Sequence, residues 1–135
     1  MKFCWCTIMV RDMEESIRFY RDIVGLSIRR ELTAWPNIEI VFMGDGGDEL
    51  ELIHNPRLNA ETMGSGLSIG FITESLEEMM QFVQSKGIEI EGGPFRPNQF
   101  VTFFNVRDPN GLRVQFIEKK YPHGAADMEP PFDNA

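Results

Sequence analysis

The sequence predicts an α+β fold built from two βαβββ modules, and three observations indicate it. An internal repeat aligns residues 13–20 with residues 76–83, and both copies carry apolar residues at helical spacing. Stretches that alternate with a period of two, as half-buried strands do, flank each predicted helix. Turn-forming runs of Gly, Pro, Asn and Asp separate those stretches. The expected order is therefore strand, helix and three strands, twice over.

Each predicted helix has a start signal and a stop signal. Asp12 and Ser75 stand just before the two helices and can cap their first amides. Acidic residues follow in both first turns, where they complement the positive end of the helix dipole. Gly25 and Gly87 are expected to end the two helices, because a glycine readily adopts the conformation that follows a last helical turn.

The predicted strands divide evenly between the modules. Module one spans residues 1–55 and module two spans residues 65–120, which together form one domain over residues 1–120. Residues 121–135 lack periodicity and are expected to form a flexible or dimer-wrapping tail. The expected strands cover residues 3–10, 26–32, 38–43, 49–54, 66–72, 88–91, 100–106 and 112–118, with Gly92-Gly93-Pro94 and Asp108-Pro109-Asn110-Gly111 among the turns.

Composition excludes several classes of partner. The chain of 135 residues has a formal net charge of −8, which argues against a nucleic-acid surface because phosphate contacts require clustered Lys and Arg. No apolar run approaches the roughly 18 residues that a membrane span requires. The two cysteines, Cys4 and Cys6, cannot supply a disulfide framework, so a reducing cytoplasm is the expected location. We interpret them as small buried core residues rather than as a redox or soft-metal pair.

A duplicated βαβββ unit places one face of each sheet against its helix and leaves the other to be covered, so two sheets can curl into a cup. Alternation assigns Cys4, Cys6, Ile8 and Val10 to the helix side of the first strand. The cup-facing residues expected from module one are Trp5, Thr7, Met9, Glu49, Glu51 and Ile53. The repeat makes Leu67 the counterpart of Trp5 and Gln115 the counterpart of Glu51, so all four are expected to approach one another.

Two motifs resemble those of the vicinal oxygen chelate superfamily, which includes glyoxalase I, bleomycin-resistance proteins and extradiol dioxygenases. The first is residues 10–20 leading into Val24-Gly25-Leu26, and the second is Asp108-Pro109-Asn110-Gly111 leading into residues 114–118. The resemblance covers roughly residues 3–118 and implies the glyoxalase/bleomycin resistance/dihydroxybiphenyl dioxygenase fold, a cupped mixed sheet. It also implies a homodimer.

The resemblance further implies where a metal would lie. In glyoxalase I relatives the four cup positions read His or Gln, then Glu, His and Glu, whereas here they read Trp5, Glu51, Leu67 and Gln115. Trp5 and Leu67 offer no ligand atom, and a divalent transition metal requires three or four nitrogen, oxygen or sulfur ligands. The sequence therefore predicts no metal and no other cofactor. His54 and His123 are not expected to repair the site.

The remaining cup residues suit a flat or hydrophobic small molecule. Beside Trp5, Thr7, Met9, Glu51 and Gln115, the expected lining includes Leu67, Ile69, Phe71 and Phe103. Phe103 shares a face with Gln115 if the Asp108 turn carries a glycine bulge, whereas a two-residue turn would place Phe104 there instead.

Three functions are compatible with this lining. The leading hypothesis is a metal-independent protein that binds a small hydrophobic or aromatic molecule, as bleomycin-resistance proteins do. An alternative is a lyase or isomerase similar to lactoylglutathione lyase, with Glu51 as general base; Glu51 could equally hydrogen-bond Gln115. The third is a non-catalytic dimeric scaffold whose cup is filled by Trp5 and Leu67.

Overall fold

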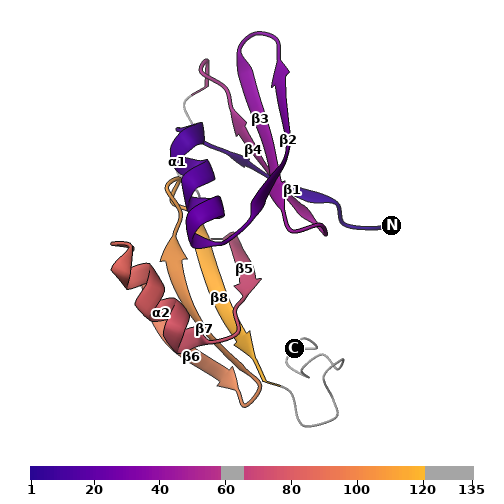
Figure 1. The fold of residues 1–135 in the computed structure, drawn as a ribbon. Helices are drawn as coiled ribbons and strands as arrows, with labels where there is room; N and C mark the ends of the chain where they lie inside the picture. The colour runs from indigo at the N-terminus through magenta and orange to yellow at the C-terminus, as the bar shows by residue number, and fades with distance from the viewer. Residues whose placement is uncertain (59–65, 121–135) are drawn as a thin grey trace. The chain divides into compact units, whose positions relative to one another are not determined.

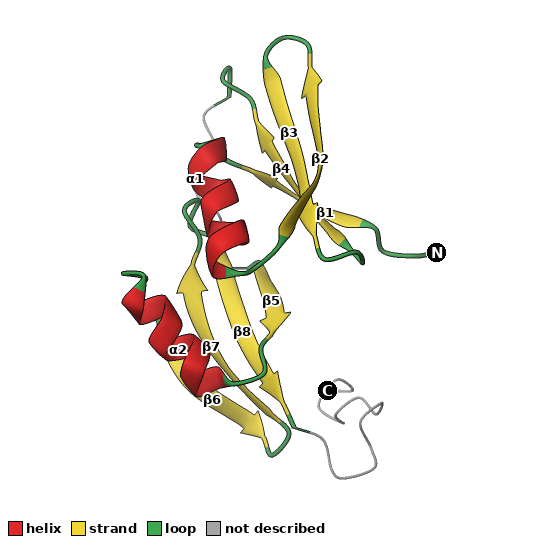
Figure 2. Cartoon of the chain, in the orientation of Figure 1, coloured by secondary structure: helices red, strands yellow, loops and turns green. Residues whose placement is uncertain are grey.

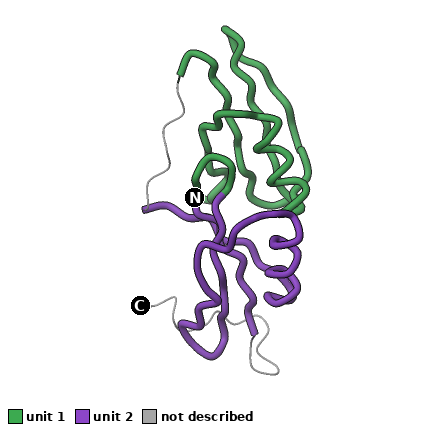
Figure 3. Tube along the Cα trace, turned by 90° about the vertical axis from the view of Figure 1, so that its left-hand side faces the viewer, with its two compact units in different colours: residues 1–64, 108–112 green, residues 65–107, 113–135 purple. Residues whose placement is uncertain are grey.

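The computed structural model describes residues 1–58 and 66–120, and it contains two compact units (Figure 3). Unit 1 comprises Met1–Gly64 together with Asp108–Leu112, and unit 2 comprises Ser65–Arg107 and Arg113–Ala135. The expected α+β class is confirmed, because each unit has a four-stranded mixed sheet and a helix (Figure 2). None of the helices in the described part of the chain is long and apolar enough to cross a membrane.

The sheet of unit 1 has the strand order β1-β4-β3-β2, with β1 parallel to β4 and the other pairs antiparallel (Figure 1). Its strands are β1 (Trp5–Met9), β2 (Ser27–Ala34), β3 (Ile38–Gly44) and β4 (Glu49–His54). Helix α1 (Met13–Arg18) continues as one π-helical turn, η1 (Phe19–Ile23). The predicted cap is confirmed, since the Asp12 side chain accepts from the backbone N–H of Glu15.

The sheet of unit 2 repeats this arrangement with the order β5-β8-β7-β6. Its strands are β5 (Ser68–Ile72), β6 (Gly92–Asn98), β7 (Val101–Arg107) and β8 (Arg113–Lys119), and α2 (Leu76–Ser85) precedes β6. Ser75 caps α2 by accepting from the N–H of Glu78. The Glu118 carboxylate also accepts from the N–H of Leu76, which lowers the pKa of Glu118.

One predicted strand lies elsewhere. Residues 88–91 were expected to be a strand followed by a turn at Gly92-Gly93-Pro94, but the strand is β6, Gly92–Asn98. β6 is an edge strand with irregular pairing to β7, and it contains Pro94 and Pro97. An edge strand tolerates proline because one side of its backbone has no strand neighbour to receive an N–H.

The core of unit 1 lies between the sheet and its helix. Buried side chains alternate along β4, and Ile8, Leu50 and Leu52 lie on the helix side as expected. Burying such aliphatic side chains contributes roughly 1.5–3 kcal/mol each. The expectation that Cys4 and Cys6 are buried is wrong for Cys4, which is exposed just before β1, and Cys6 is half-buried. The face of the sheet turned away from α1 carries Trp5, Thr7, Phe42, Glu49 and Glu51, and we call it the distal face of unit 1.

Unit 1 is completed by the Asp108–Leu112 loop, which the chain reaches only after β7. The Asp108 carboxylate accepts from the Tyr20 hydroxyl at 2.7 Å and from the backbone N–H groups of Asn110 and Leu112 at 2.8 Å each. Asn110 is 2% exposed; its side-chain oxygen accepts from the N–H of Arg11 and its amide group donates to the Ser16 hydroxyl. Hydrogen bonds therefore fix the loop to Ser16 of α1, to Arg11 before this helix and to Tyr20 after it.

Candidate functional site

The distal face of unit 1 combines residues from all four of its strands. The parallel register of β1 and β4 pairs Trp5 with Glu49 and Thr7 with Glu51. β3 places Phe42 opposite Glu51, and β2 places Arg30 opposite Phe42. Since paired residues point to the same side of a sheet, these side chains form one continuous surface.

An aromatic pair forms the centre of this surface. The rings of Trp5 and Phe42 meet edge to face, with centroids 5.3 Å apart and an interplanar angle of 74°. The Arg30 guanidinium lies 4.0 Å from the centroid of the Phe42 ring, a cation–π contact. Phe42 is consequently 3% exposed, whereas Trp5 remains 44% exposed. The Trp5 ring thus packs against the buried Phe42 and remains accessible to a planar ligand.

Two carboxylates flank the aromatic pair, and each has a hydrogen-bond donor. The Arg30 guanidinium donates to Glu49 at 2.8 Å, and the Thr7 hydroxyl donates to Glu51 Oε1 at 2.5 Å. The ion pair fixes the guanidinium over Phe42, and the Thr7 hydrogen bond orients the Glu51 carboxylate. A carboxylate held in this way can accept a further hydrogen bond or a proton from a bound molecule.

The structure brings together the residues that the sequence predicted for module one. Trp5, Thr7, Met9 and Glu51 all lie on the distal face of unit 1, with Met9 paired to Ile53 two residues further along the strands than Thr7 and Glu51. Sequence reasoning missed Arg30 and Phe42. Alternation along β3 and β4 could have identified Phe42, but Arg30 depends on a register shift in β2 between Ile28 and Arg30, which no sequence pattern marks.

In unit 2 the predicted faces are correct for two strands and wrong for the third. Asn105 pairs with Gln115, so Phe103 and Gln115 lie on the face turned away from α2, the distal face of unit 2. Residues Ile69 and Phe71, however, pair with Val114 and Phe116, which are buried on the α2 side. The expectation that Ile69 and Phe71 face away from the helix is therefore wrong.

The error is one residue in the alignment of the repeat. β5 begins at Ser68, and its register with β8 pairs Ser68 with Arg113 and Gly70 with Gln115. Since Thr7 pairs with Glu51 and Glu51 corresponds to Gln115, the counterpart of Thr7 is Gly70 and that of Trp5 is Ser68. Leu67, 47% exposed, lies just before the strand and is not the counterpart of Trp5. The half-buried Ile69 and Phe71 lie on the α2 side of the sheet, where Phe71 contacts the buried Phe116 with ring centroids 6.5 Å apart.

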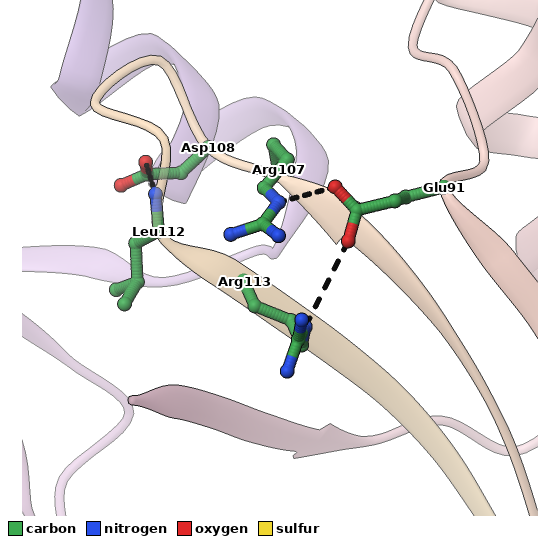
Figure 4. A network of polar contacts seen from close by, with 5 residues as sticks. All are labelled: Glu91, Arg107, Asp108, Leu112 and Arg113. Carbon is green, nitrogen blue, oxygen red and sulfur yellow. Dashed lines mark hydrogen bonds and ion pairs between the residues drawn. The ribbon is translucent and has the colours of Figure 1, made fainter. Parts of the chain in front are cut away.

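A charged cluster lies where β7 and β8 adjoin the Asp108–Leu112 loop (Figure 4). Arg107 and Arg113 face each other across the ladder, and the Glu91 carboxylate lies between them. Arg107 Nε donates to Glu91 Oε2, while Arg113 Nε is 3.8 Å from Glu91 Oε1. The hydrogen bond from Arg107, supported by the charges of both arginines, lowers the pKa of Glu91 and keeps it ionised.

The metal that the resemblance implies does not fit these residues. At the four positions the corrected register gives Trp5, Glu51, Ser68 and Gln115, which supply one carboxylate, one hydroxyl and one amide. No group of three or more His, Cys, Asp or Glu side chains that could hold a metal ion occurs within residues 1–58 and 66–120. His54 lies 3.6 Å from Glu39, and His123 is outside the described residues.

Comparisons with known proteins agree with this architecture. The chain is 29% identical over 120 residues to a probable lactoylglutathione lyase of Synechocystis, covering 82% of this chain and 90% of the relative. The trypanothione-dependent glyoxalase I of Leishmania major has a similar fold, with a TM-score of 0.75 at 22% identity over 87% of this chain and 86% of that one. An antibiotic binding protein from a Streptomyces species does too, with a TM-score of 0.67 at 15% identity over 89% of this chain and 97% of the other.

A family model also matches most of the chain. It describes the Glyoxalase/Bleomycin resistance protein/Dioxygenase superfamily, and it matches residues 2–116, which include every strand except the end of β8. The strand order in both units and the two capped helices accord with that match. The chain belongs to the Glyoxalase/Bleomycin resistance protein/Dioxygenase superfamily.

Proposed function

We propose that this protein binds a small hydrophobic or aromatic molecule on the distal face of unit 1 and does so without a resident divalent metal. The observation that carries the proposal is the exposed Trp5 ring, which rests on the buried Phe42 and has polar groups at its edges. A flat ligand stacking on Trp5 would cover apolar surface that water now contacts. Thr7 and Glu51 lie on the same surface and would orient a polar substituent.

The chain offers a direct reporter for this binding, because it has only two tryptophans. Trp35 is 89% exposed in the β2–β3 turn, so Trp35→Phe leaves Trp5 as the sole indole without disturbing the core. We expect 1-naphthol to change the fluorescence of that variant in a saturable way. Trp5→Phe, which retains only Trp35, is the matched control and should respond weakly and without saturation. Equal responses in the two variants, or none in either, would contradict the proposal.

The metal-free part of the proposal has its own measurement. We expect elemental analysis of the purified protein to find no stoichiometric Zn, Ni or Mn. The reason is that Trp5 and Ser68 stand where ligating side chains would be required. About one equivalent of any of these metals, retained through gel filtration, would contradict it.

A lyase or isomerase that uses Glu51 as general base is the second candidate. Two observations favour this candidate. The Thr7 hydroxyl holds the Glu51 carboxylate in one orientation. The similarity to lactoylglutathione lyases points to the same class of reaction. If the protein has such an activity, Glu51→Gln should abolish it, since an amide cannot accept the proton. Glu49→Gln, on the same face but paired with Arg30, is the matched control and should retain most of it.

The proposal also includes the cellular location. Cys4 and Cys6 are free thiols, which suits the reducing conditions of the cytoplasm. Fractionation that finds the protein outside the cytoplasm would contradict this part alone.

A further inference from the structure

One motif that the proposed function does not use is Asn110-Gly111, in the Asp108–Leu112 loop of unit 1. It is the only Asn-Gly pair in the chain of 135 residues. An asparagine followed by glycine is especially prone to deamidation, because glycine has no side chain to hinder attack by its backbone nitrogen on the asparagine amide. Asn110 is therefore the asparagine at which this reaction should be fastest when the backbone is free to move.

Deamidation of this pair needs no reactant other than water. The backbone nitrogen of Gly111 forms a bond to Cγ of Asn110, the Cγ–Nδ2 bond breaks, and ammonia leaves with the proton that the Gly111 nitrogen releases. Water then opens the resulting five-membered imide at one of its two carbonyl carbons. One opening gives aspartate. The other gives isoaspartate, in which the main chain runs through Cγ and is one carbon longer.

The folded loop restrains the reacting groups through hydrogen bonds. Asn110 is 2% exposed, and its Oδ1 accepts from the backbone N–H of Arg11 at 3.1 Å. Its Nδ2 donates to Ser16 Oγ and to Asp108 Oδ2, at 3.2 Å each. The N–H of Gly111, which would have to lose its proton, donates to the carbonyl oxygen of Asp108 at 3.0 Å. Attack would break these hydrogen bonds in a buried site, so the folded chain should be protected.

Neither product satisfies the site as asparagine does. An aspartate would replace the Nδ2 donor with an oxygen next to Asp108 Oδ2, so two buried carboxylates would meet. An isoaspartate would also lengthen the main chain between Asp108 and the N–H groups of Gly111 and Leu112, from which Asp108 accepts hydrogen bonds. The damage would remain after the chain returns to conditions that favour folding.

We propose that Asn110 is a modification site that deamidates only when the Asp108–Leu112 loop opens, so that the reaction marks chains that have unfolded. The folded protein then reacts at the rate of the unfolded chain multiplied by the fraction of molecules whose loop is open. Each hydrogen bond that holds the loop closed lowers that fraction. This proposal does not depend on ligand binding at the Trp5 surface, so the two can fail separately.

The test compares the full chain in buffer and in a concentration of urea that unfolds it, at one mildly alkaline pH and one temperature. Peptide mass spectrometry follows deamidation at each asparagine with time. In urea, Asn110 should react at least about tenfold faster than Asn98 and Asn105, which precede the larger residues Gln99 and Val106. In buffer, Asn110 should react at least about a hundredfold more slowly than in urea, because few folded molecules are open at any moment.

Substitutions around the loop test whether its hydrogen bonds provide the protection. Tyr20→Phe removes the hydrogen bond that Asp108 Oδ2 accepts at 2.7 Å, so deamidation in buffer should become about fivefold faster or more. Ser16→Ala removes an acceptor of Asn110 Nδ2 and should act in the same direction. Neither change should alter the rate in urea. Trp35→Phe, at an exposed turn residue, is the matched control and should leave both rates unchanged.

The reacted chain supplies the second measurement. Ion exchange separates deamidated chains by their added negative charge, and removal of urea then allows refolding. Chains with isoaspartate at position 110 should refold to a lower urea midpoint than the parent, or not at all. Asn110→Asp adds the same charge to an unaltered main chain and should lose less stability.

Three results would overturn the inference. The first is deamidation of Asn110 at equal rates in buffer and in urea. The second is a reaction at Asn110 in urea that is no faster than that at Asn98. The third is an isoaspartate chain whose urea midpoint equals that of the parent.

Discussion

The hydrogen bond between Tyr20 and Asp108 joins two residues that are both almost completely buried. Burial disfavours the phenolate, and the nearby negative charge of Asp108 disfavours it further, so the pKa of Tyr20 is raised well above its ordinary value. Tyr20 therefore remains a hydrogen-bond donor at every physiological pH. Asp108 depends on such donors, because a buried carboxylate is stable only when its oxygens are hydrogen-bonded.

Replacing Tyr20 with Phe should destabilise the protein by about 1–3 kcal/mol, because Asp108 Oδ2 loses the shorter of its two side-chain hydrogen bonds and keeps only that from Asn110 Nδ2, while the ring packing is kept. The measurement is the free energy of unfolding from urea denaturation. Trp35→Phe, at an exposed turn residue, is the control and should stay within about 0.5 kcal/mol of the parent. A Tyr20→Phe protein as stable as the parent would show that the hydrogen bond contributes nothing net.

The raised pKa of Tyr20 also predicts a loss of stability in alkali. Above a pH of about 10, the unfolded chain releases the Tyr20 proton while the folded chain retains it. The folded state then binds more protons than the unfolded state, so the free energy of unfolding falls as pH rises, by up to about 1.4 kcal/mol per pH unit from this group. Urea denaturation between pH 9 and 11 should show this slope in the parent, and Tyr20→Phe should show a shallower one.

Among the strands, those with strong alternation could be predicted from sequence, and those that depend on a neighbour could not. β4 has the predicted bounds, Glu49–His54, because its charged and apolar residues alternate regularly. β6 was predicted to be a turn because Gly92, Gly93 and Pro94 are turn formers. It is a strand because β7 supplies a pairing partner on one side, and local composition does not contain that information.

The faces of β5 were misassigned for a different reason. Leu67, Ile69 and Phe71 were expected to line a binding surface because the repeat aligned Leu67 with Trp5, but neither a repeat nor an alternating pattern says by itself which side of a strand the helix covers. The register with β8 decides it, and this register places Ser68 and Gly70 on the distal face of unit 2 instead. This one-residue difference replaces three expected apolar side chains on that face with a serine and a glycine at the two positions opposite Arg113 and Gln115.

Gly93 gives a prediction for β6. It has a φ of 103°, and a Cβ built there would lie 3.0 Å from both the carbonyl oxygen of Phe103 and the Cα of Phe104. Gly93→Ala should therefore destabilise the protein by roughly 2 kcal/mol or more, from backbone strain and a contact with main-chain atoms that cannot move easily. Gly46→Ala is the matched control. Gly46 has a φ of 111° and no atom within 4 Å, so only the strain remains. Equal losses in urea denaturation would refute the steric argument.

At the scale of the whole molecule, the repeat predicted two similar sheets with their helices, and both are present. The sequence did not predict that the Asp108–Leu112 loop belongs to unit 1. Its glycine, proline and asparagine predicted a turn, and the structure has a turn there, closed by a hydrogen bond from the N–H of Gly111 to the carbonyl oxygen of Asp108. Its attachment to α1 depends on hydrogen bonds to Tyr20 and Ser16, which are 88 and 94 positions away from their partners in the chain. No local pattern encodes such pairs.

We predict that the protein is a homodimer, as the family resemblance implies. Large apolar side chains of unit 2 that the proposed ligand surface does not use, Ile72 and Phe95, are exposed, and association with a second chain would cover such side chains. Sedimentation equilibrium at micromolar concentration should give twice the chain mass of 15.5 kDa. A monomer at all concentrations tested would contradict it. Removal of residues 122–135, which lie outside the described residues, should weaken association if this tail wraps the partner.

The position of Asp108 in the chain has a consequence for biosynthesis. When the last strand of the first sheet has left the ribosome, Asp108 and Asn110 have not yet been translated. The Tyr20 hydroxyl therefore still lacks its acceptor Asp108, and the Ser16 hydroxyl still lacks its donor Asn110. The amino-terminal half thus leaves the exit tunnel as an incomplete body and can reach its final stability only after β7 and the residues that follow it have emerged. A pause in translation after β4 and before Asn110 would prolong the lifetime of a nascent chain in which the Tyr20 and Ser16 hydroxyls lack these hydrogen-bond partners.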